Sequence, residues 1–376
     1  MSLKPANSAA GYLRDQPHKG RGAALNLEGR FEQWQREAYA DGWEAEAQDA
    51  AAEIGAAGLK TVITHEIAKS IISENDSPDI PFRYSLNPYR GCEHGCIYCF
   101  ARPSHAYLGL SPGLDFETRI FAKVNAPSLL RTELSRRGYR CEVISLGINT
   151  DAYQPCEREY QLTRQCLEVM SEFNQPVSLI TKSALIERDI DILKSLMARR
   201  LVHVAISLTT LDHQVSRYLE PRTAAPTRRL QTIRRLAESG IPVGVNVAPV
   251  IPFLTDHELE TLLDAAQLAG ASSAGYVLLR LPWELKSLFR NWLETHFPLK
   301  AEHVMSRLQQ MRGGKDNDPN FGSRMLGQGI FAELLRQRFV RASARLGMGT
   351  YGRNAMRKLE VSRFAVPGRA VQGSLF

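Results

Sequence analysis

Three of the six cysteines in this 376-residue chain, Cys92, Cys96 and Cys99, lie within a stretch of eight residues. Their spacing is C-x3-C-x2-C on what must be one short loop. Three thiolates on one loop can ligate three irons of a [4Fe–4S] cubane. The fourth iron then keeps an open position, as catalytic metal sites do. The other cysteines are scattered, and we interpret Cys141 and Cys166 as packing residues.

A zinc site is the main alternative for this triad. Zinc takes four ligands, and His94 or His105 could supply the fourth. Zinc-binding sequences normally pair one C-x2-C motif with a second, distant pair, which this sequence lacks. The spacing therefore favours an iron–sulfur cluster over zinc.

The elements that must position this loop follow a strand–helix rhythm. Apolar, β-branched runs predict six strands, over Tyr84–Leu86, Val143–Ile148, Val177–Thr181, His203–Leu208, Val243–Val250 and Ala274–Leu279. Helical patterns lie between them, over Ser128–Arg137, Glu159–Phe173, Glu187–Ala198, Thr227–Ser239 and Asp256–Ala269. This alternation predicts an α/β fold with a parallel sheet, either a partial barrel or a doubly wound sheet. In both, ligands bind at the carboxyl ends of the strands.

The chain divides into four predicted parts. Residues 1–60 lack apolar periodicity and are predicted to be a mobile N-terminal arm, with a short helix near Arg30–Ala38 and with Trp34 and Trp43 as docking points. Residues 61–283 carry the βα units. Residues 284–347 are predicted to form a C-terminal helical extension, and residues 348–376 a loose tail.

The composition is that of an ordinary soluble protein, with 44% hydrophobic and 23% charged residues. No apolar run is long enough for a membrane-spanning helix, and the N-terminus lacks the apolar segment of a secretion signal, so we expect a cytoplasmic protein without membrane partners. The net charge of +7 permits a nucleic-acid partner without requiring one.

Several motifs then identify a resemblance. The pattern C-x3-C-x-aromatic-C, with Tyr98 before the last cysteine, resembles the signature of the radical S-adenosylmethionine (SAM) superfamily. The segments NPYRGCEHGCIYCFAR, GINTDAYQPCE, ITKS, VAISLTT and LEPRTAAPTRRL resemble the branch grouped around spore photoproduct lyase, and more closely still a bacterial family of uncharacterised radical SAM proteins within it. The resemblance extends roughly from Thr61 to Gly347.

This resemblance implies a partial (β/α)6 TIM-like barrel whose cluster loop follows the first strand. It also implies an enzyme in which SAM chelates the open iron of a [4Fe–4S] cluster. Reductive cleavage of SAM then gives a 5′-deoxyadenosyl radical that abstracts hydrogen from a substrate, here unidentified. The electron would come from a donor such as flavodoxin or ferredoxin. The alternatives are a nucleic-acid repair or base-modifying enzyme and a non-catalytic iron–sulfur or zinc protein.

The resemblance also assigns SAM contacts at the ends of strands. Thr150, Lys182 and Ser207 match lyase positions of this kind, and Asp151 matches a carboxylate beside the first. Tyr98 lies in the stretch that contacts adenine. Arg222 is predicted either to bind the SAM carboxylate or to pair with Glu220.

Two further residues belong to the predicted barrel mouth. Asn246 is predicted either to face substrate or adenine, or to satisfy buried backbone. Arg280 ends the sixth strand, where it would contact substrate or form an ion pair with Glu284.

The sequence departs from the lyase at one functional position. The lyase has a hydrogen-donating cysteine shortly before its Ser/Thr–Asp pair, whereas this chain has Gly147, Ile148 and Asn149 there. The lyase reaction therefore does not transfer with the resemblance, and no catalytic residue is assigned.

Overall fold

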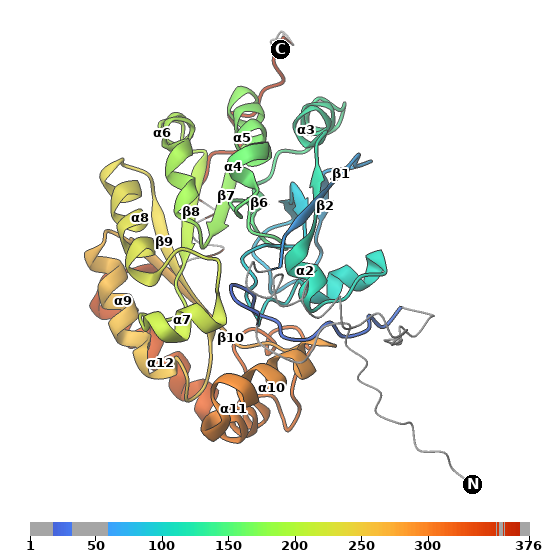
Figure 1. The fold of residues 1–376 in the computed structure, drawn as a ribbon. Helices are drawn as coiled ribbons and strands as arrows, with labels where there is room; N and C mark the ends of the chain where they lie inside the picture. Colours follow the sequence, from blue (N-terminus) through green and yellow to red (C-terminus); the bar gives the residue numbers. More distant parts are fainter. Residues whose placement is uncertain (1–17, 32–58, 351, 353–355, 357, 369–376) are drawn as a thin grey trace, which may run out of the picture.

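The computed structural model describes residues 18–31, 59–350, 352, 356 and 358–368. All six predicted strands are present and form one curved parallel sheet (Figure 1): β3 (Tyr84–Leu86), β6 (Ile144–Leu146), β7 (Val177–Thr181), β8 (Val202–Ser207), β9 (Val243–Val250) and β10 (Ser273–Leu278). β2 (Ile72–Glu74) pairs antiparallel with β3 at one edge, and β11 (Gly349–Thr350) pairs in parallel with β10 at the other. The order of the six strands follows the chain without a reversal, so the sheet is a partial (β/α)6 barrel rather than a doubly wound sheet.

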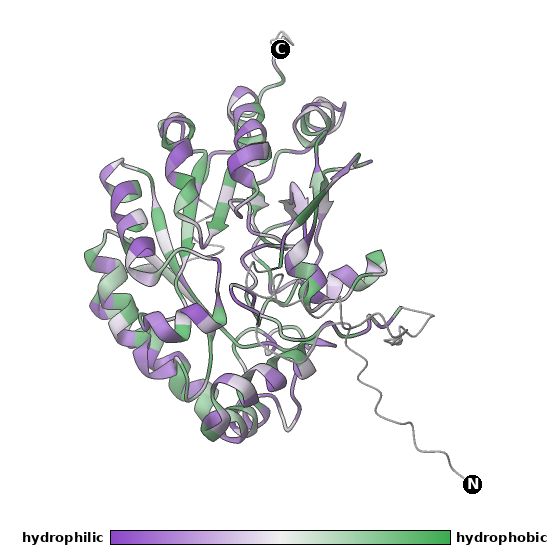
Figure 2. Ribbon diagram, in the orientation of Figure 1, coloured by the Kyte–Doolittle hydropathy of each residue, from purple (hydrophilic) through white to green (hydrophobic). Residues whose placement is uncertain are grey.

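The predicted helices pack on the outside of this sheet (Figure 1). They are α3 (Ala126–Leu134), α5 (Leu162–Glu172), α6 (Ile190–Met197), α8 (Pro226–Glu238) and α9 (Leu259–Leu268). Shorter turns of helix complete the connections: α4 (Glu157–Tyr160), α7 (His213–Leu219), η2 (Ala184–Asp189) and η3 (Asp256–Glu258). Every residue of β8 is buried, and the strands are largely hydrophobic in Figure 2. A near-continuous apolar strand is what a parallel sheet covered by helices requires.

A second, smaller sheet precedes the main crossovers and was not evident from the sequence pattern. It joins β1 (Val62–Glu66), β5 (Arg119–Lys123) and β4 (Tyr89–Arg90), beside η1 (Arg102–Leu108) and α2 (Leu114–Thr118). β4 is only two residues long and leads directly into the cysteine segment, so this sheet fixes the start of the loop that carries the cysteines.

The C-terminal extension consists of three helices, α10 (Leu285–His296), α11 (Pro298–Gln310) and α12 (Gly329–Arg345). The tail that follows differs from the expected loose segment. Glu360 N–H donates to Arg200 O at 2.9 Å, Ala365 N–H donates to Phe173 O at 3.0 Å, and Phe364 packs against the Phe173 ring. The described part of the tail is therefore docked at the amino ends of β7 and β8, at the top of Figure 1.

The described part of the N-terminal arm is also docked. Residues 18–31, which we call the strap, run along the barrel near α2 and reach α10 (Figure 1). Ala23 within it is almost fully buried. The predicted short helix beyond Phe31, together with Trp34 and Trp43, lies outside the described residues.

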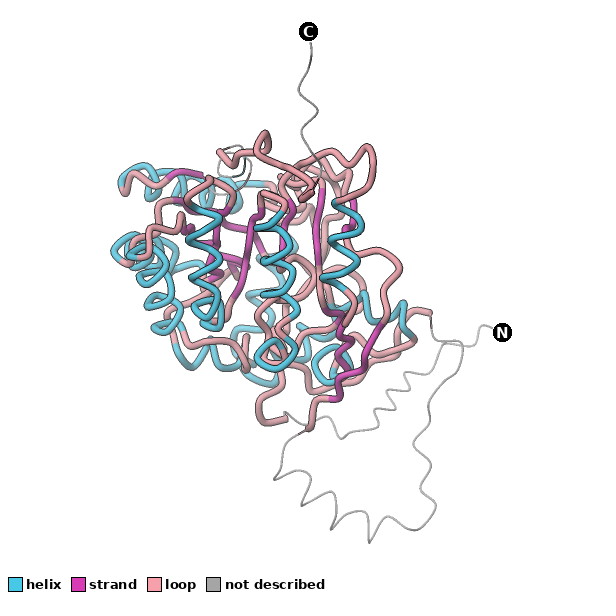
Figure 3. Tube along the Cα trace, turned by 90° about the horizontal axis from the view of Figure 1, so that it is seen from above, coloured by secondary structure: helices cyan, strands magenta, loops and turns pink. Residues whose placement is uncertain are grey.

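Figure 3 gives the same arrangement from above, with the helices around the strands. Among the described residues, none of the helices is long and apolar enough to cross a membrane.

Candidate functional site

The three predicted ligands lie on one loop after β4, which we call the cysteine loop (residues 91–99): Cys92, Cys96 and Cys99. The first two are buried and the third is half-buried. Two tight turns shape the loop, because Gly95 N–H donates to Cys92 O at 3.3 Å and Cys99 N–H donates to Cys96 O at 3.2 Å. Gly95 has a φ of +65°, and a Cβ there would lie 2.6 Å from Glu117 Oε2. Both the backbone and the available space therefore require glycine at this position.

A buried ion pair fixes the back of the cysteine loop. Arg102 is fully buried and donates to Cys96 O at 2.9 Å and to Gly95 O at 3.0 Å. Its guanidinium pairs with the buried Glu117 carboxylate. Removing one partner of such a pair costs about 3–5 kcal/mol, because the other charge stays buried and unpaired. The loop is thus held in shape by charged groups that the sequence analysis did not single out.

The same carboxylate attaches the strap. Gly22 N–H and Ala23 N–H donate to Glu117 at 2.9 and 2.8 Å, and Arg21 donates to Glu117 O at 2.8 Å. A Cβ on Gly22 would lie only 1.9 Å from Gly95 O, so the strap touches the cysteine loop backbone directly.

The electrostatic surroundings keep the unligated thiols of Cys92 and Cys96 protonated. Burial, together with Asp151 and the neighbouring thiols, holds the pKa of Cys92 well above its usual range. Burial raises the pKa of Cys96 to about 12, against the opposing charge of Lys182. Since metal ligands are thiolates, metal binding here must release protons.

The donor set fits a cubane. No three His, Cys, Asp or Glu side chains in the described part of the chain converge closely enough to share one metal ion. A cubane does not need such convergence, because each of its cysteines binds a different iron. The histidines of the zinc alternative have other neighbours: His94 Nδ1 lies 3.2 Å from Asp151 Oδ2, and His105 Nε2 lies 3.0 Å from Arg119 O.

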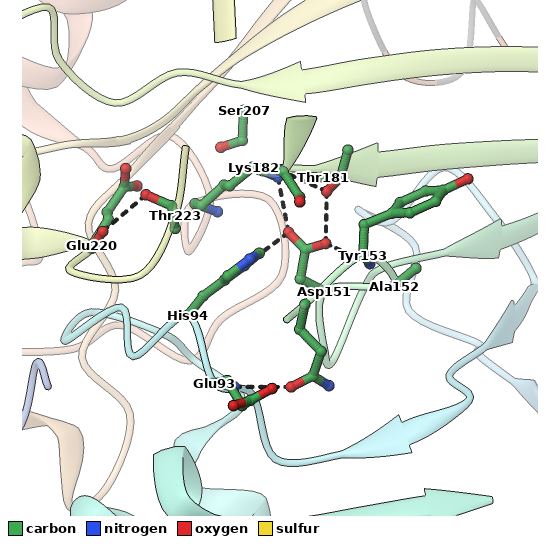
Figure 4. Close-up of polar contacts among 12 residues, drawn as sticks. Glu93, His94, Asp151, Ala152, Tyr153, Thr181, Lys182, Ser207, Glu220 and Thr223 are labelled. Carbon is green, nitrogen blue, oxygen red and sulfur yellow. Dashed lines mark hydrogen bonds and ion pairs between the residues drawn. The ribbon is translucent and has the colours of Figure 1, made fainter. Parts of the chain in front are cut away.

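Asp151 lies at the centre of a polar network between β6, β7 and the cysteine loop (Figure 4). Its buried carboxylate accepts hydrogen bonds from the Thr181 hydroxyl at 2.6 Å, Lys182 N–H at 2.8 Å and Tyr153 N–H at 2.9 Å. Burial alone would raise the pKa of Asp151, but His94, the Thr181 hydroxyl and Lys182 N–H hold it well below its usual range.

Three predicted contacts close to this network have unused hydrogen-bonding capacity. The Thr150 hydroxyl is buried without a hydrogen-bond partner. The Ser207 hydroxyl has only a long contact of 3.4 Å to Ala248 O. The Lys182 ammonium lies 5.8 Å from the centre of the Tyr98 ring, and no described residue accepts a hydrogen bond from it. Burial alone would lower the pKa of Lys182, but the nearby Cys96, Glu220 and Asp151 raise it, so the ammonium stays charged.

Glu220 does not pair with Arg222. It forms a buried ion pair with Arg229 and also accepts hydrogen bonds from the Tyr98 and Thr209 hydroxyls. Arg229 is nine residues away in sequence but reaches back from α8, where it also donates to Ser207 O at 3.0 Å. The Glu220–Arg229 ion pair therefore holds the phenol of Tyr98 next to the end of β8.

Arg222 faces the cysteine loop and Thr61, which directly precedes β1, instead. Its guanidinium lies 3.3 Å from Glu93 and 3.3 Å from the Thr61 hydroxyl. Asn246 is half-buried on β9, in register with Ser207 and Gly275, and its side-chain amide has no partner among the described residues.

Arg280 does not pair with Glu284 either. Glu284 binds Arg30 of the strap, with two contacts at 3.1 and 3.0 Å, and the Arg30 guanidinium stacks 4.3 Å from the centre of the Trp283 ring. The strap therefore connects the cysteine loop at Gly22 with the segment that follows β10.

Comparisons with known proteins agree with this geometry. The family described as the radical SAM superfamily matches residues 86–266, which include the cysteine loop and β4 to β9. The chain belongs to the radical SAM superfamily. It is therefore an enzyme, and its family uses a [4Fe–4S] cluster and SAM.

The sequence relatives include an uncharacterised protein of Mycobacterium tuberculosis, 34% identical over 317 residues, which cover 83% of this chain and 88% of the relative. An uncharacterised protein of Methanocaldococcus jannaschii is 27% identical over 177 residues, covering 47% of this chain and 63% of the relative. The descriptions of these two relatives name no substrate.

Solved structures of spore photoproduct lyase share the fold. One variant superimposes with a TM-score of 0.55 at 15% identity, covering 86% of this chain and 88% of the lyase. The lyase complexed with a dinucleoside spore photoproduct gives 0.55 at 15% identity, covering 77% and 81%. At this identity the likeness establishes the fold alone.

The structure sharpens the departure from the lyase. Gly147 has a φ of +84°, and a Cβ there would lie 2.1 Å from Ile180 O. At this one of the three positions, no side chain fits without moving β7.

Proposed function

We propose that Cys92, Cys96 and Cys99 each bind one iron of a [4Fe–4S] cluster and leave the fourth iron for SAM. The observation that carries this proposal is one loop that presents three cysteines at the mouth of a partial barrel, held from behind by the Arg102–Glu117 pair. When bound, the cluster supplies the electron that cleaves SAM to methionine and a 5′-deoxyadenosyl radical, which abstracts hydrogen from a substrate.

The chain's own residues provide the SAM pocket in this proposal. Lys182 supplies a charged donor for the SAM carboxylate or ribose, and the unpartnered hydroxyls of Thr150 and Ser207 supply neutral hydrogen bonds. These groups follow β6 and β7 or end β8, at the edge where parallel barrels bind ligands.

Four other residues have supporting parts in the proposal. Tyr98 lines the adenine side, since its hydroxyl is held by Glu220. Asn246 offers a free amide beside it. In this proposal the Arg222 guanidinium binds the SAM carboxylate while it keeps its ion pair with Glu93. Asp151 acts through its neighbours, because it orients Thr181, the Lys182 backbone and His94.

The test is anaerobic reconstitution with iron and sulfide, followed by reduction and addition of SAM. The expected result is 5′-deoxyadenosine, detected by mass spectrometry, from the intact chain and none from Cys96→Ala. Cys166→Ala is the matched control, because this buried cysteine lies on α5 away from the triad and should leave the product unchanged. Zinc in place of a cubane would contradict the proposal.

The physiological electron is proposed to come from a small reductant such as flavodoxin or ferredoxin, which replaces the chemical reductant of this assay. Product formation with reduced flavodoxin, at a rate that saturates with its concentration, would support a specific donor contact.

A further inference from the structure

Arg280 follows β10 at the carboxyl end of the barrel, where Leu279 N–H still donates to Val250 O at 3.0 Å. Four residues later Glu284 binds the strap, and the strap touches the cysteine loop. Arg280 therefore belongs to the same face of the barrel as the proposed cluster site. Barrel enzymes bind their substrates on this face.

The guanidinium of Arg280 has no carboxylate partner among the described residues. Within the described part of the chain, its one hydrogen-bond contact is from Nη1 to the Met325 thioether at 3.5 Å, and sulfur is a weak acceptor. Its Nε is buried without a partner. The side chain as a whole is half-buried, so the outer edge of the guanidinium stays reachable from solvent.

The two nearby carboxylates are committed to other groups. Asp79 is held by a two-pronged contact with Arg324, at 2.5 and 2.7 Å. Asp318 accepts from the Ser323 hydroxyl at 2.5 Å and from Asn320 N–H at 2.9 Å. Neither forms an ion pair with Arg280.

A second, fully buried guanidinium lies beside it. Arg312 donates to Leu278 O at 3.0 Å and Leu279 O at 2.7 Å, and to Arg324 O at 2.6 Å. Its hydrogen bonds go to backbone carbonyls, and no carboxylate of the described residues forms an ion pair with it, although the charge of Asp318 acts on it from nearby. Arg312 lies close to Arg280 because it donates to the carbonyls of the two residues that precede Arg280. Burial and the charge of Arg280 lower the pKa of Arg312 to about 10. The end of β10 therefore carries an excess of positive charge.

We infer that Arg280 binds an anionic group of the substrate, a phosphoryl or carboxylate group, in the positive field of Arg312. The inference deepens the proposed function, on which it rests, by naming the chemical class of the substrate. The planar fork of a guanidinium matches two oxygens of such an anion, and the buried Arg312 holds the loop that carries Met325 against β10.

The test compares Arg280→Gln with the intact, cluster-loaded chain. Inorganic phosphate and acetate are titrated separately at constant ionic strength, with calorimetry as the readout. At least one anion is expected to bind saturably, and Arg280→Gln is expected to weaken it at least tenfold. Arg290→Gln is the matched control, because this arginine lies on α10 in a surface pair with Glu302. Tighter binding of phosphate would indicate a phosphoryl group on the substrate, and tighter binding of acetate a carboxylate group.

Two outcomes would overturn the inference: equal anion affinity in Arg280→Gln and the intact chain, or no saturable binding of either anion by the intact chain. Formation of 5′-deoxyadenosine without substrate is measured in parallel. It should be unchanged in Arg280→Gln, and its loss would assign Arg280 to SAM instead. If the intact chain makes no 5′-deoxyadenosine yet binds the anion through Arg280, the proposed function fails while the anion site stands.

Discussion

At the scale of single residues, Lys182 differs from the other charged groups of the site because no described residue accepts its hydrogen bonds. A charge-assisted hydrogen bond contributes about 1.5–3 kcal/mol. We therefore predict that Lys182→Met weakens SAM binding to the cluster-loaded chain about 10- to 100-fold. Equilibrium dialysis with labelled SAM measures this, and the exposed Lys194→Met on α6 is the control. A change of less than twofold would remove Lys182 from the SAM pocket.

The depressed pKa of Asp151 predicts that the free energy of unfolding depends on pH. Its pKa in the folded chain is depressed by His94, by the Thr181 hydroxyl and by Lys182 N–H, against the effect of burial. Such a group contributes stability that is fully present above its unfolded pKa, about 4, and that is lost as the pH falls through the folded value. Asp151→Asn should therefore lower the free energy of unfolding of the apo-chain by about 2 kcal/mol at pH 7.

The difference between the intact chain and Asp151→Asn should be constant from pH 7 to pH 5 and narrow below about pH 4. Urea unfolding at each pH gives the two free energies. A gap that is independent of pH down to pH 3 would mean that packing around Asp151, rather than its charge, carries the effect.

Single residues also show what the sequence could and could not predict about the site. The cysteines could be proposed as ligands because their spacing within one loop is itself the signal, and the structure places all three on that loop. The sequence analysis missed Glu117 and Arg102 because their role depends on a buried ion pair between them. Glu117 also binds the strap, which is some 95 residues away in sequence. Arg222 and Glu220 are near neighbours in sequence, yet Glu220 turns inward to Arg229. Short sequence separation was a poor guide to which charges meet.

At the scale of elements, the strap yields a prediction about the cysteine loop. Gly22→Ala would place a methyl group 1.9 Å from Gly95 O, so the strap must move away from Glu117. Overpacking of this kind costs about 1–3 kcal/mol. We expect less iron per chain after reconstitution and a lower melting temperature. In the control Gly349→Ala the new methyl group meets nothing closer than 3.6 Å, and both quantities should be unchanged. Full iron loading in Gly22→Ala would show that the strap does not support the loop.

The elements themselves were predictable in proportion to their length and burial. The barrel strands and the helices between them agree with the prediction to within a few residues, because both periodicities are set by burial against one core. The small sheet of β1, β4 and β5 could not be predicted from the sequence, because β4 has only two residues and most residues of β1 are exposed. The strap has no periodicity at all, because it is held by backbone donors and glycines rather than by an apolar face.

At the scale of the whole molecule, the partial barrel leaves its two sheet edges unpaired with each other, and the strap links the two sides. It contacts the cysteine loop at Gly22 and the segment after β10 through the Arg30–Glu284 pair. Because metal binding and local folding are coupled, loading the cluster should stabilise whatever packs on the cysteine loop. The strap and the loop should then respond together.

Hydrogen exchange measured by mass spectrometry tests this coupling. Amide exchange over residues 18–31 and 91–102 should slow when the cluster is loaded, and removal of iron by a chelator should reverse the effect. Exchange over residues 358–368, which dock at the opposite end of the barrel, serves as the internal control and should not change. Protection confined to residues 91–102 would mean that the strap is fixed independently of the cluster. Protection that includes the strap would make the N-terminal segment part of the cofactor site, because Glu117 binds both the strap and the arginine behind the cysteines.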